Sequence, residues 1–282
     1  MSKIKLSDYS NSIMDLVYEG YKPKQIANKL KLNPVSVNSW LRTNHPELSF
    51  RPNPGNVHYF DIIDSYAKAY ILGFIAADGA LVKANSSSTS LTITIKYEDR
   101  DILDFIRTEI GSEAPLREIK RESPFDNNKF IRHIRYTNSN KELITGIMKW
   151  GIGYNKSLSM GNILPKIPYD YRDAFIIGYF DGDGSVTVRN GLYPNDRGCL
   201  CKDNSLYIQI RGTESFFIGV CEHLNIDPSH IHKNDSIPNL TFASKKDTMR
   251  FYRCYKHLPF YLKRKHDKFL ERINLPCYDK YR

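Results

Sequence analysis

The chain has 282 residues, enough for two domains or for one domain with an appendage. Hydrophobic residues make up 41% of it, which supports a sizeable core, and Lys plus Arg exceed Asp plus Glu by 41 − 31 = 10. This excess favours a polyanionic partner. Five cysteines, an odd number, and no secretory segment after Met1 predict an intracellular protein with reduced thiols and no membrane span.

Residues 1–51 are expected to form a helix-turn-helix module. Residues 24–30 carry apolar side chains at helical core spacing, and Pro34 is expected to open a second helix at its first position. That helix places Val37 and Trp40 on one face. The pattern resembles the helix-turn-helix of regulators, although Lys31 stands where such turns often have glycine. The outward residues, expected to meet base edges and phosphates, are Ser36, Asn38, Ser39 and Arg42. A helical cap that only stabilises the main domain is the competing interpretation.

Residues 52–58, which contain two prolines and a glycine, are the expected linker. After it, the stretch Tyr70–Gly79 reads YILGFIAADG, and the same phrase returns as FIIGYFDGDG in Phe175–Gly184. Each copy is apolar on nearly every face and is therefore expected to be a buried helix. The copies are 183 − 78 = 105 residues apart, a period that indicates two small domains. These are predicted at 59–160 and 161–282.

The first repeat continues with strands, helices and a basic ribbon. Apolar and polar residues alternate over 91–95, the pattern of a sheet with one wet face. An amphipathic helix is expected over 99–110, followed by two strands, about 115–121 and 129–136, and a helix over 140–150. A two-stranded ribbon fits the DNA major groove, although a charged strand can equally be a solvated face. Its candidate DNA contacts are Arg117, Arg121, Arg132 and Arg135.

The second repeat restates this order, with a hairpin loop enlarged over 191–204. The expected elements are a motif helix over 169–182, strands over 185–189 and 206–210, a helix over 213–224, strands near 230 and 240, and a helix over 247–255. Arg189 and Arg211 are further candidate DNA contacts. The predicted fold class is α+β, with two pseudo-symmetric αββαββα repeats that form a saddle-shaped antiparallel sheet, plus a small all-α N-terminal domain.

Small residues recur four apart in both motif helices, as Gly73 and Ala77 and as Gly178 and Gly182. Residues at this spacing share one helical face, and small side chains there let two backbones approach closely. Each motif helix is therefore expected to pack against the other copy. The glycine that closes each motif is expected to end its helix in the left-handed conformation.

This packing would place Asp78 and Asp183 at adjacent helix C-termini. A carboxylate there faces the negative end of the helix dipole, and the two carboxylates also repel each other. A hard divalent cation such as Mg²⁺, which prefers carboxylate and carbonyl oxygens, is expected between them. An Asp-Gly pair can also simply turn a hairpin. Its occurrence twice, each time before β-type sequence, favours the cation site.

Residues 71–79 and 176–184 resemble the two signature helices of the LAGLIDADG homing endonucleases of the double-motif, single-chain type. The resemblance covers about residues 60–272. It implies that Asp78 and Asp183 bind the catalytic cation, Mg²⁺ or Mn²⁺, and the main-chain carbonyls of Ala77 and Gly182 are the expected further ligands. The sixth motif position is often acidic in this family. It is Asp181 in the second copy but Ala76 in the first, which departs from the symmetry of the family.

Basic residues are expected near the scissile phosphates. In the family, a lysine where the last strand enters the closing helix lies near the scissile phosphate, and Lys141 and Lys246 occupy matching places in the two repeats. A solvated lysine at a helix start is the competing interpretation. The segment 261–265 resembles a basic segment common near the C-terminal end of family members, and its expected phosphate contacts are Lys263, Arg264 and Lys265. A surface helix cap is the alternative there.

The resemblance implies a Mg²⁺-dependent endonuclease that makes staggered double-strand cuts at a long DNA target, in the service of intron or gene homing. We expect a monomer with double-stranded DNA as its partner. A transcription regulator that keeps the fold without cutting is an alternative, supported by the helix-turn-helix and opposed by the retained acidic pair. An RNA maturase that assists intron splicing is a third possibility, because a basic surface serves intron RNA equally well.

Overall fold

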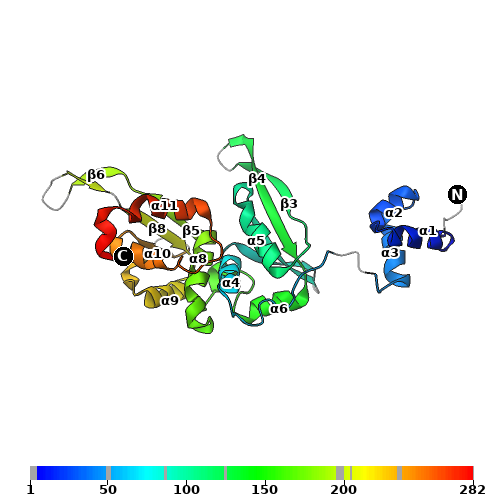
Figure 1. Cartoon of the computed structure of the whole chain (residues 1–282), viewed down its shortest axis with the longest axis horizontal. Helices are drawn as coiled ribbons and strands as arrows, with labels where there is room; N and C mark the ends of the chain where they lie inside the picture. Colours follow the sequence, from blue (N-terminus) through cyan, green and yellow to red (C-terminus); the bar gives the residue numbers. More distant parts are fainter. Residues whose placement is uncertain are drawn as a thin grey trace. The chain divides into compact units, whose positions relative to one another are not determined.

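The computed structural model describes residues 5–48, 52–85, 88–123, 126–194, 200–203, 205–233 and 237–281. The chain divides into two units, residues 1–52 and 53–282, and each of them has its own buried core (Figure 1). Within the described residues, no helix combines the length and apolar character that a membrane crossing requires.

The N-terminal unit is a bundle of short helices. Its elements are a 3-10 turn Leu6–Tyr9 followed by α1 (Ser10–Tyr18), α2 (Pro23–Lys29) and α3 (Pro34–Asn44). The two helices expected from the sequence are present, and the Asn33 side chain caps α3 by accepting the N–H groups of Val35 and Ser36 at 2.9 and 3.2 Å. Trp40 is only half-buried, and Leu41 instead joins Val37 in the core. Lys31 holds a left-handed φ of 53°, the conformation for which glycine is usual.

The first repeat of the second unit has the predicted order of helices and strands. Its elements are α4 (Tyr66–Asp78), β1 (Gly79–Asn85), β2 (Ser88–Lys96), a 3-10 turn (Tyr97–Asp99), α5 (Arg100–Ile110), β3 (Arg117–Ser123), β4 (Asp126–Asn138) and α6 (Lys141–Lys149). The strands form an antiparallel sheet in the order β1-β2-β4-β3. Leu91, Ile93 and Ile95 of β2 are buried as their alternation predicts.

The second repeat has the same plan with one addition. Its elements are α8 (Arg172–Asp183), β5 (Gly184–Val188), β6 (Gly191–Pro194), β7 (Leu200–Asp203), β8 (Leu206–Arg211), α9 (Glu214–Leu224), β9 (Ile231–His232), β10 (Asn239–Phe242) and α10 (Lys245–Arg253). Four strands form an antiparallel sheet in the order β5-β8-β10-β9. The enlarged hairpin begins and ends as a separate pair, β6 and β7. The predicted α+β fold of two similar repeats with a helical N-terminal region is therefore confirmed.

Short helices connect and close the repeats. The connection between the repeats contains α7 (Lys156–Ser159) and the 3-10 turns Leu164–Lys166 and Tyr169–Tyr171. A further 3-10 turn, Pro228–His230, precedes β9. After α10, the chain continues as α11 (Lys263–Ile273) and ends in a 3-10 turn, Pro276–Tyr281. Figure 1 shows α11 beside β5. The basic segment near residue 263 thus begins a helix.

The two motif helices pack against each other, as their small residues predicted. A Cβ atom added to Gly73 would lie 2.1 Å from the Phe175 carbonyl oxygen, and one added to Gly178 would lie 2.0 Å from the Tyr70 carbonyl oxygen. The backbones of α4 and α8 are therefore in direct contact, with no room for any side chain at these two positions. Most residues of both helices are buried.

The expectation of left-handed glycines at the ends of the motif helices is wrong. Gly79 has φ −73° and ψ 143°, and Gly184 has φ −99° and ψ 161°, so both are extended and begin β1 and β5. The requirement for glycine is steric. A Cβ on Gly79 would lie 2.6 Å from the Ile75 carbonyl oxygen, and one on Gly184 would lie 2.2 Å from a ring carbon of Phe180.

Candidate functional site

The packing of α4 on α8 brings the two motif acids to one place. Asp78 is the last residue of α4 and Asp183 is the last residue of α8. The helix ends touch, because a Cβ added to Gly182 would lie 2.4 Å from the Ala77 Cβ and 3.4 Å from the Asp78 Cγ. Asp78 is half-buried, and Asp183 is exposed.

Both motif acids have pKa values above the ordinary value of an aspartate. Burial, followed by the charge of Asp183, raises the pKa of Asp78 to about 6. Although the Asp183 side chain is partly open to solvent, the protein atoms around it still desolvate the carboxylate and raise its pKa, and Lys156, Lys265 and Arg211 oppose that rise. Among the residues that the structure describes, neither carboxylate forms an ion pair. The two acids are thus close enough to repel each other and have no direct cationic partner.

A cation here would have to use main-chain oxygens as well as carboxylates. Within the described ranges, no group of three or more His, Cys, Asp or Glu side chains comes together. The carbonyl of Ala77, one of the two expected main-chain ligands, accepts a hydrogen bond from the Lys156 ammonium. A divalent cation could bind that oxygen only if the ammonium moved away.

The lysines whose charges act on the two acids are not the two that the sequence suggested. Lys141 and Lys246 lie in the first turns of α6 and α10 and are exposed. Lys156 and Lys265 are the lysines that lower the pKa of Asp78. The prediction placed the lysine before the closing helix of each repeat, whereas in the fold the chain returns to the acids after that helix. Lys156 follows α6 and Lys265 follows α10. This shared place, just after the closing helix of each repeat, is the sequence feature that could have identified both lysines.

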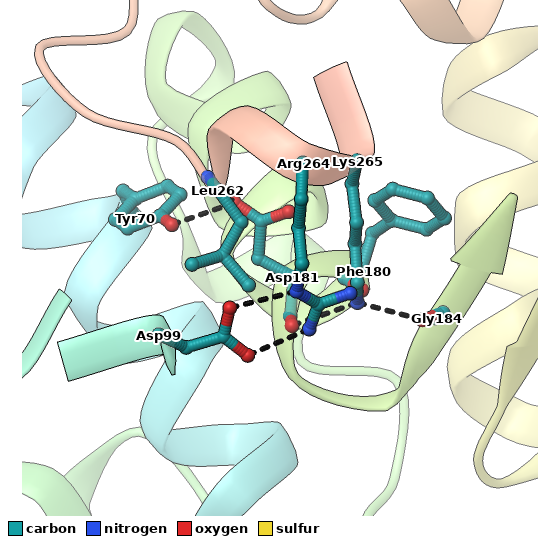
Figure 2. Close-up of polar contacts among 8 residues, drawn as sticks. All are labelled: Tyr70, Asp99, Phe180, Asp181, Gly184, Leu262, Arg264 and Lys265. Atoms are coloured by element: carbon teal, nitrogen blue, oxygen red, sulfur yellow. Dashed lines mark hydrogen bonds and ion pairs between the residues drawn. The ribbon is translucent and has the colours of Figure 1, made fainter. Parts of the chain in front are cut away.

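Both of these lysines are buried against the ends of the motif helices. Lys265 is 4% exposed, and its ammonium donates to the carbonyls of Phe180, Asp181 and Gly184 at 2.7, 2.8 and 2.6 Å (Figure 2). Burial lowers the pKa of Lys265 to about 8, and Asp181 opposes that effect. These lysines satisfy carbonyls that a helix C-terminus leaves without partners. The expectation that Lys265 contacts a phosphate therefore does not hold, because all its N–H groups are in use.

The other two basic residues of this segment also form ion pairs within the chain. Arg264 makes a two-bond contact with Asp99 of the first repeat, at 2.7 Å for each bond (Figure 2). Lys263 is exposed and pairs with Asp267 at 2.6 Å. Arg264 thus joins the two repeats.

The basic ribbon presents its arginines on two different faces. Arg117 pairs directly with Arg135 across β3 and β4, and Arg135 pairs with Thr94 of β2, so these residues share one face with Arg121. This face lies opposite the buried Ile134 and Tyr136. Arg132 is on the core side of the sheet, where it bonds to Glu118 at 2.7 and 3.1 Å and stacks on Tyr97. Arg132 therefore lies on the opposite side of the sheet from the other three arginines.

The face that carries Arg121 reaches Asp78, the motif acid of the first repeat. A cavity of about 240 Å³ is lined by both motif and ribbon residues, among them Asp78, Asp181, Gly182, Lys96, Arg121 and His133. In the second repeat, Arg189 and Arg211 are exposed on the face opposite the buried Val186 and Ile208. Arg211 is close enough to lower the pKa of Asp183.

The outward face of the N-terminal unit is as the sequence indicated. The four residues expected to meet DNA lie on α3 and are all exposed, namely Ser36, Asn38, Ser39 and Arg42. The core of this unit is closed without them. They are therefore free of a structural role in the unit and available for a partner.

Comparison with known proteins links the second unit to one fold. No protein-family model and no curated protein matches the chain. Among solved structures, the I-SmaMI LAGLIDADG homing endonuclease bound to cleaved DNA has a TM-score of 0.50 at 12% identity, covering 74% of this chain and 88% of that one. The LAGLIDADG meganuclease I-CpaMI bound to uncleaved DNA has a TM-score of 0.50 at 14% identity, covering 72% and 89%.

A third structure, I-SmaMI bound to an uncleaved DNA target in the presence of calcium ions, has a TM-score of 0.50 at 15% identity and covers 72% of this chain and 87% of that one. Identities of this size establish the architecture and leave activity open. The chain therefore has the fold of the LAGLIDADG homing endonucleases.

The acid pair predicts a pH-dependent stability. The pKa of Asp78 is about 6 in the folded chain against an ordinary value of 3.8, so folding favours the protonated form. The Asp78 carboxyl group therefore does not reduce the free energy of unfolding below about pH 4, and it reduces that free energy by the full amount above about pH 6. Asp78→Asn imitates the protonated acid, and we expect it to raise the free energy of unfolding at about pH 7 by up to about 2 kcal/mol. Urea unfolding in the absence of divalent ions measures this gain.

The gain should shrink as the pH falls toward about 4. Asp64→Asn is the control with the opposite sign, because the hydrogen bond from Lys68 lowers the pKa of Asp64. A gain from Asp78→Asn that is the same at both pH values would show that the repulsion of a buried charge is not its source.

Proposed function

We propose that this protein is a Mg²⁺- or Mn²⁺-dependent, site-specific DNA endonuclease that acts as a monomer. It would make staggered double-strand cuts at a long target, in the service of intron or gene homing. The observation that carries the proposal is the meeting of Asp78 and Asp183 at two touching helix ends, with a raised pKa at each acid and no ion pair within the described chain. Two carboxylates that lie close together without an ion-pair partner destabilise the fold, and their oxygens are the ligands that a hard divalent cation prefers.

The residues present are chemically suited to a hard divalent ion. Asp78 and Asp183 would hold it, with the main-chain carbonyls of Ala77 and Gly182 as further oxygen ligands. When bound, such an ion supplies Lewis-acid activation of water and of the phosphodiester. The short contact from Lys156 to the Ala77 carbonyl would have to open first.

The two buried lysines would then have different tasks. Lys156, once released from the Ala77 carbonyl, would be placed to donate to a phosphate oxygen, because its charge already acts on both acids. Lys265 would remain on its three carbonyls and keep the end of α8 in place. Lys141 and Lys246, which are exposed in the first turns of α6 and α10, would contribute to the general attraction of DNA rather than to the reaction.

The DNA would lie along the faces opposite the core. Arg117, Arg121 and Arg135 of the first repeat would reach a major groove, where arginine recognises guanine O6 and N7. Arg189, which stacks on Tyr207, and Arg211 would do the same in the second repeat. Arg132 and Arg264, which are bound to Glu118 and Asp99, would have no direct part in recognition.

The N-terminal unit supports a second candidate function. Its α3 presents exposed polar residues on a helix-turn-helix scaffold, and a regulator would read DNA with such a helix. We therefore infer two DNA-binding surfaces in one chain, one of which also cuts. A protein that binds DNA through both without cutting would be a transcription regulator. An intron RNA ligand would indicate a maturase.

Cleavage of DNA from the genomic locus of the protein tests the proposal. We expect purified protein with Mg²⁺ to cut this DNA, and Asp78→Asn or Asp183→Asn to reduce the rate by more than about 100-fold, because even partners outside the metal's ligands are typically worth about 10–100-fold. Asp104→Asn removes an exposed carboxylate bonded to Arg100 and should leave the rate unchanged.

Each alternative has its own outcome in this experiment. Tight DNA binding without cleavage by the wild type would favour the regulator. Preferential binding of structured intron RNA would favour the maturase.

The two faces of the basic ribbon give a matched test of the DNA interface. We expect Arg117→Ala to weaken DNA binding by about 1–3 kcal/mol if it contacts a base. Arg132→Ala removes the same charge from the same ribbon, but its guanidinium is held by Glu118 on the other face. Its effect should be within about 0.5 kcal/mol. Equal losses in a fluorescence-anisotropy titration at one salt concentration would contradict the assignment of the DNA-facing side.

A further inference from the structure

The two halves of the acid site differ in one buried contact. In the second repeat, Asp181 is 2% exposed and accepts hydrogen bonds from the Tyr70 hydroxyl at 2.7 Å and the Leu262 amide at 2.8 Å (Figure 2). Tyr70 belongs to α4 and Leu262 is the residue that precedes α11. One carboxylate therefore joins the two motif helices to the start of the last helix.

The pseudo-symmetric counterpart of this contact is missing at both of its positions. Tyr70 lies 78 − 70 = 8 residues before its motif acid, and the residue 183 − 175 = 8 before the other acid is Phe175. Asp181 lies 183 − 181 = 2 residues before its acid, and the residue 78 − 76 = 2 before the other is Ala76. The hydroxyl of Tyr70 and the carboxylate of Asp181 thus form one pair, and at the symmetry-related pair both groups are replaced by the apolar side chains of Phe175 and Ala76.

Asp181 also fixes Lys265, the lysine that holds the end of α8. Its charge is the largest favourable influence on the Lys265 ammonium. The Leu262 amide holds the start of α11 against Asp181, and this places Lys265 in the first turn of that helix. Lys265 then donates to carbonyls on both sides of Asp183, from Phe180 to Gly184. The backbone that carries Asp183 is therefore anchored from outside its own helix.

The end of α4 has a weaker anchor. Lys156 donates to the single carbonyl of Ala77 and begins a helix of only four residues, α7. The carboxylates that act on its charge are Asp183 and Asp78 themselves, whereas those that act on Lys265 are Asp181, Asp78 and Asp99. A ligand that takes these two acids would remove both carboxylates that act on Lys156, whereas Lys265 would keep Asp181 and Asp99.

We propose that Asp181 is a positioning residue for one half of the site only, so that the two DNA strands are cut by unequally supported halves. Asp181 acts through Lys265 on the backbone of Asp183, and Asp78 has no equivalent support. Loss of Asp181 then slows the cut of one strand and leaves the other. This proposal rests on the proposed endonuclease function.

Strand-resolved cleavage tests it. With each strand labelled in turn, Asp181→Asn is expected to change the ratio of the two cutting rates by at least about tenfold, because a misplacement of roughly 1 Å at a reacting centre can cost about 100-fold. DNA affinity should stay unchanged, and nicked DNA should accumulate. Tyr70→Phe, which reproduces the Phe175 arrangement, should shift the ratio in the same direction by less. Asp173→Asn, at the opposite end of α8 and paired with His223, should leave the ratio unaltered.

An equal slowing of both strands by Asp181→Asn would overturn the proposal, since it would indicate a purely structural role. Hydrogen exchange of the full-length chain without metal or DNA provides an independent test. Asp181→Asn should increase exchange in peptides covering 180–188 and leave those covering 75–83 unchanged. Equal changes in both, or none in 180–188, would also overturn it. A wild-type chain that cuts neither strand would refute the endonuclease function, and the exchange result would still decide whether Asp181 supports only this end.

Discussion

The direct contact between the backbones of α4 and α8 is the constraint on which the rest of the second unit depends. At Gly73 and Gly178 the carbonyl of the opposite helix occupies the space of a side chain. Each helix carries its motif acid at its last residue. Because the two helices are in contact up to these ends, the two acids lie close together. The two sheets then diverge from these ends, since β1 and β5 begin at the next residue. Fold and site therefore follow from one contact.

This arrangement concentrates destabilising features at one point. Two carboxylates lie at the negative ends of two helix dipoles and close to each other. Buried lysines offset part of this cost by covering the last carbonyls, and the raised pKa of Asp78 reports the part that remains. Destabilising charges of this kind are concentrated at functional sites, where a ligand can supply an offsetting interaction.

The fold and the two motif acids could be predicted from the sequence. The positions of side chains that depend on contacts distant in the sequence could not. The repeated phrase, its small residues and the alternation at 91–95 are local patterns, so the motif helices, their pairing and the sheets could be predicted. The role of Gly79 could not, because the clash that requires glycine involves Ile75 in a helix-to-strand turn. Lys156 was missed as a site residue, and Lys265 was predicted to contact phosphate instead of the end of a motif helix, since both lysines bind carbonyls that lie 79 and 84 residues away in the sequence. Arg132 could have been placed correctly, because it is an even number of residues from the buried Ile134.

We propose that the paired motif acids hold a divalent cation. Titration of Mn²⁺ into the metal-free chain, followed by the electron paramagnetic resonance signal of the free ion, tests it without knowledge of the DNA target. We expect the wild type to bind the ion near pH 7.5 and to release it toward about pH 5, as the acid whose pKa is about 6 becomes protonated. A chain in which Asp78 and Asp183 are both asparagine should take up none at this site. Undiminished Mn²⁺ binding by that double variant would show that Asp78 and Asp183 do not hold the cation.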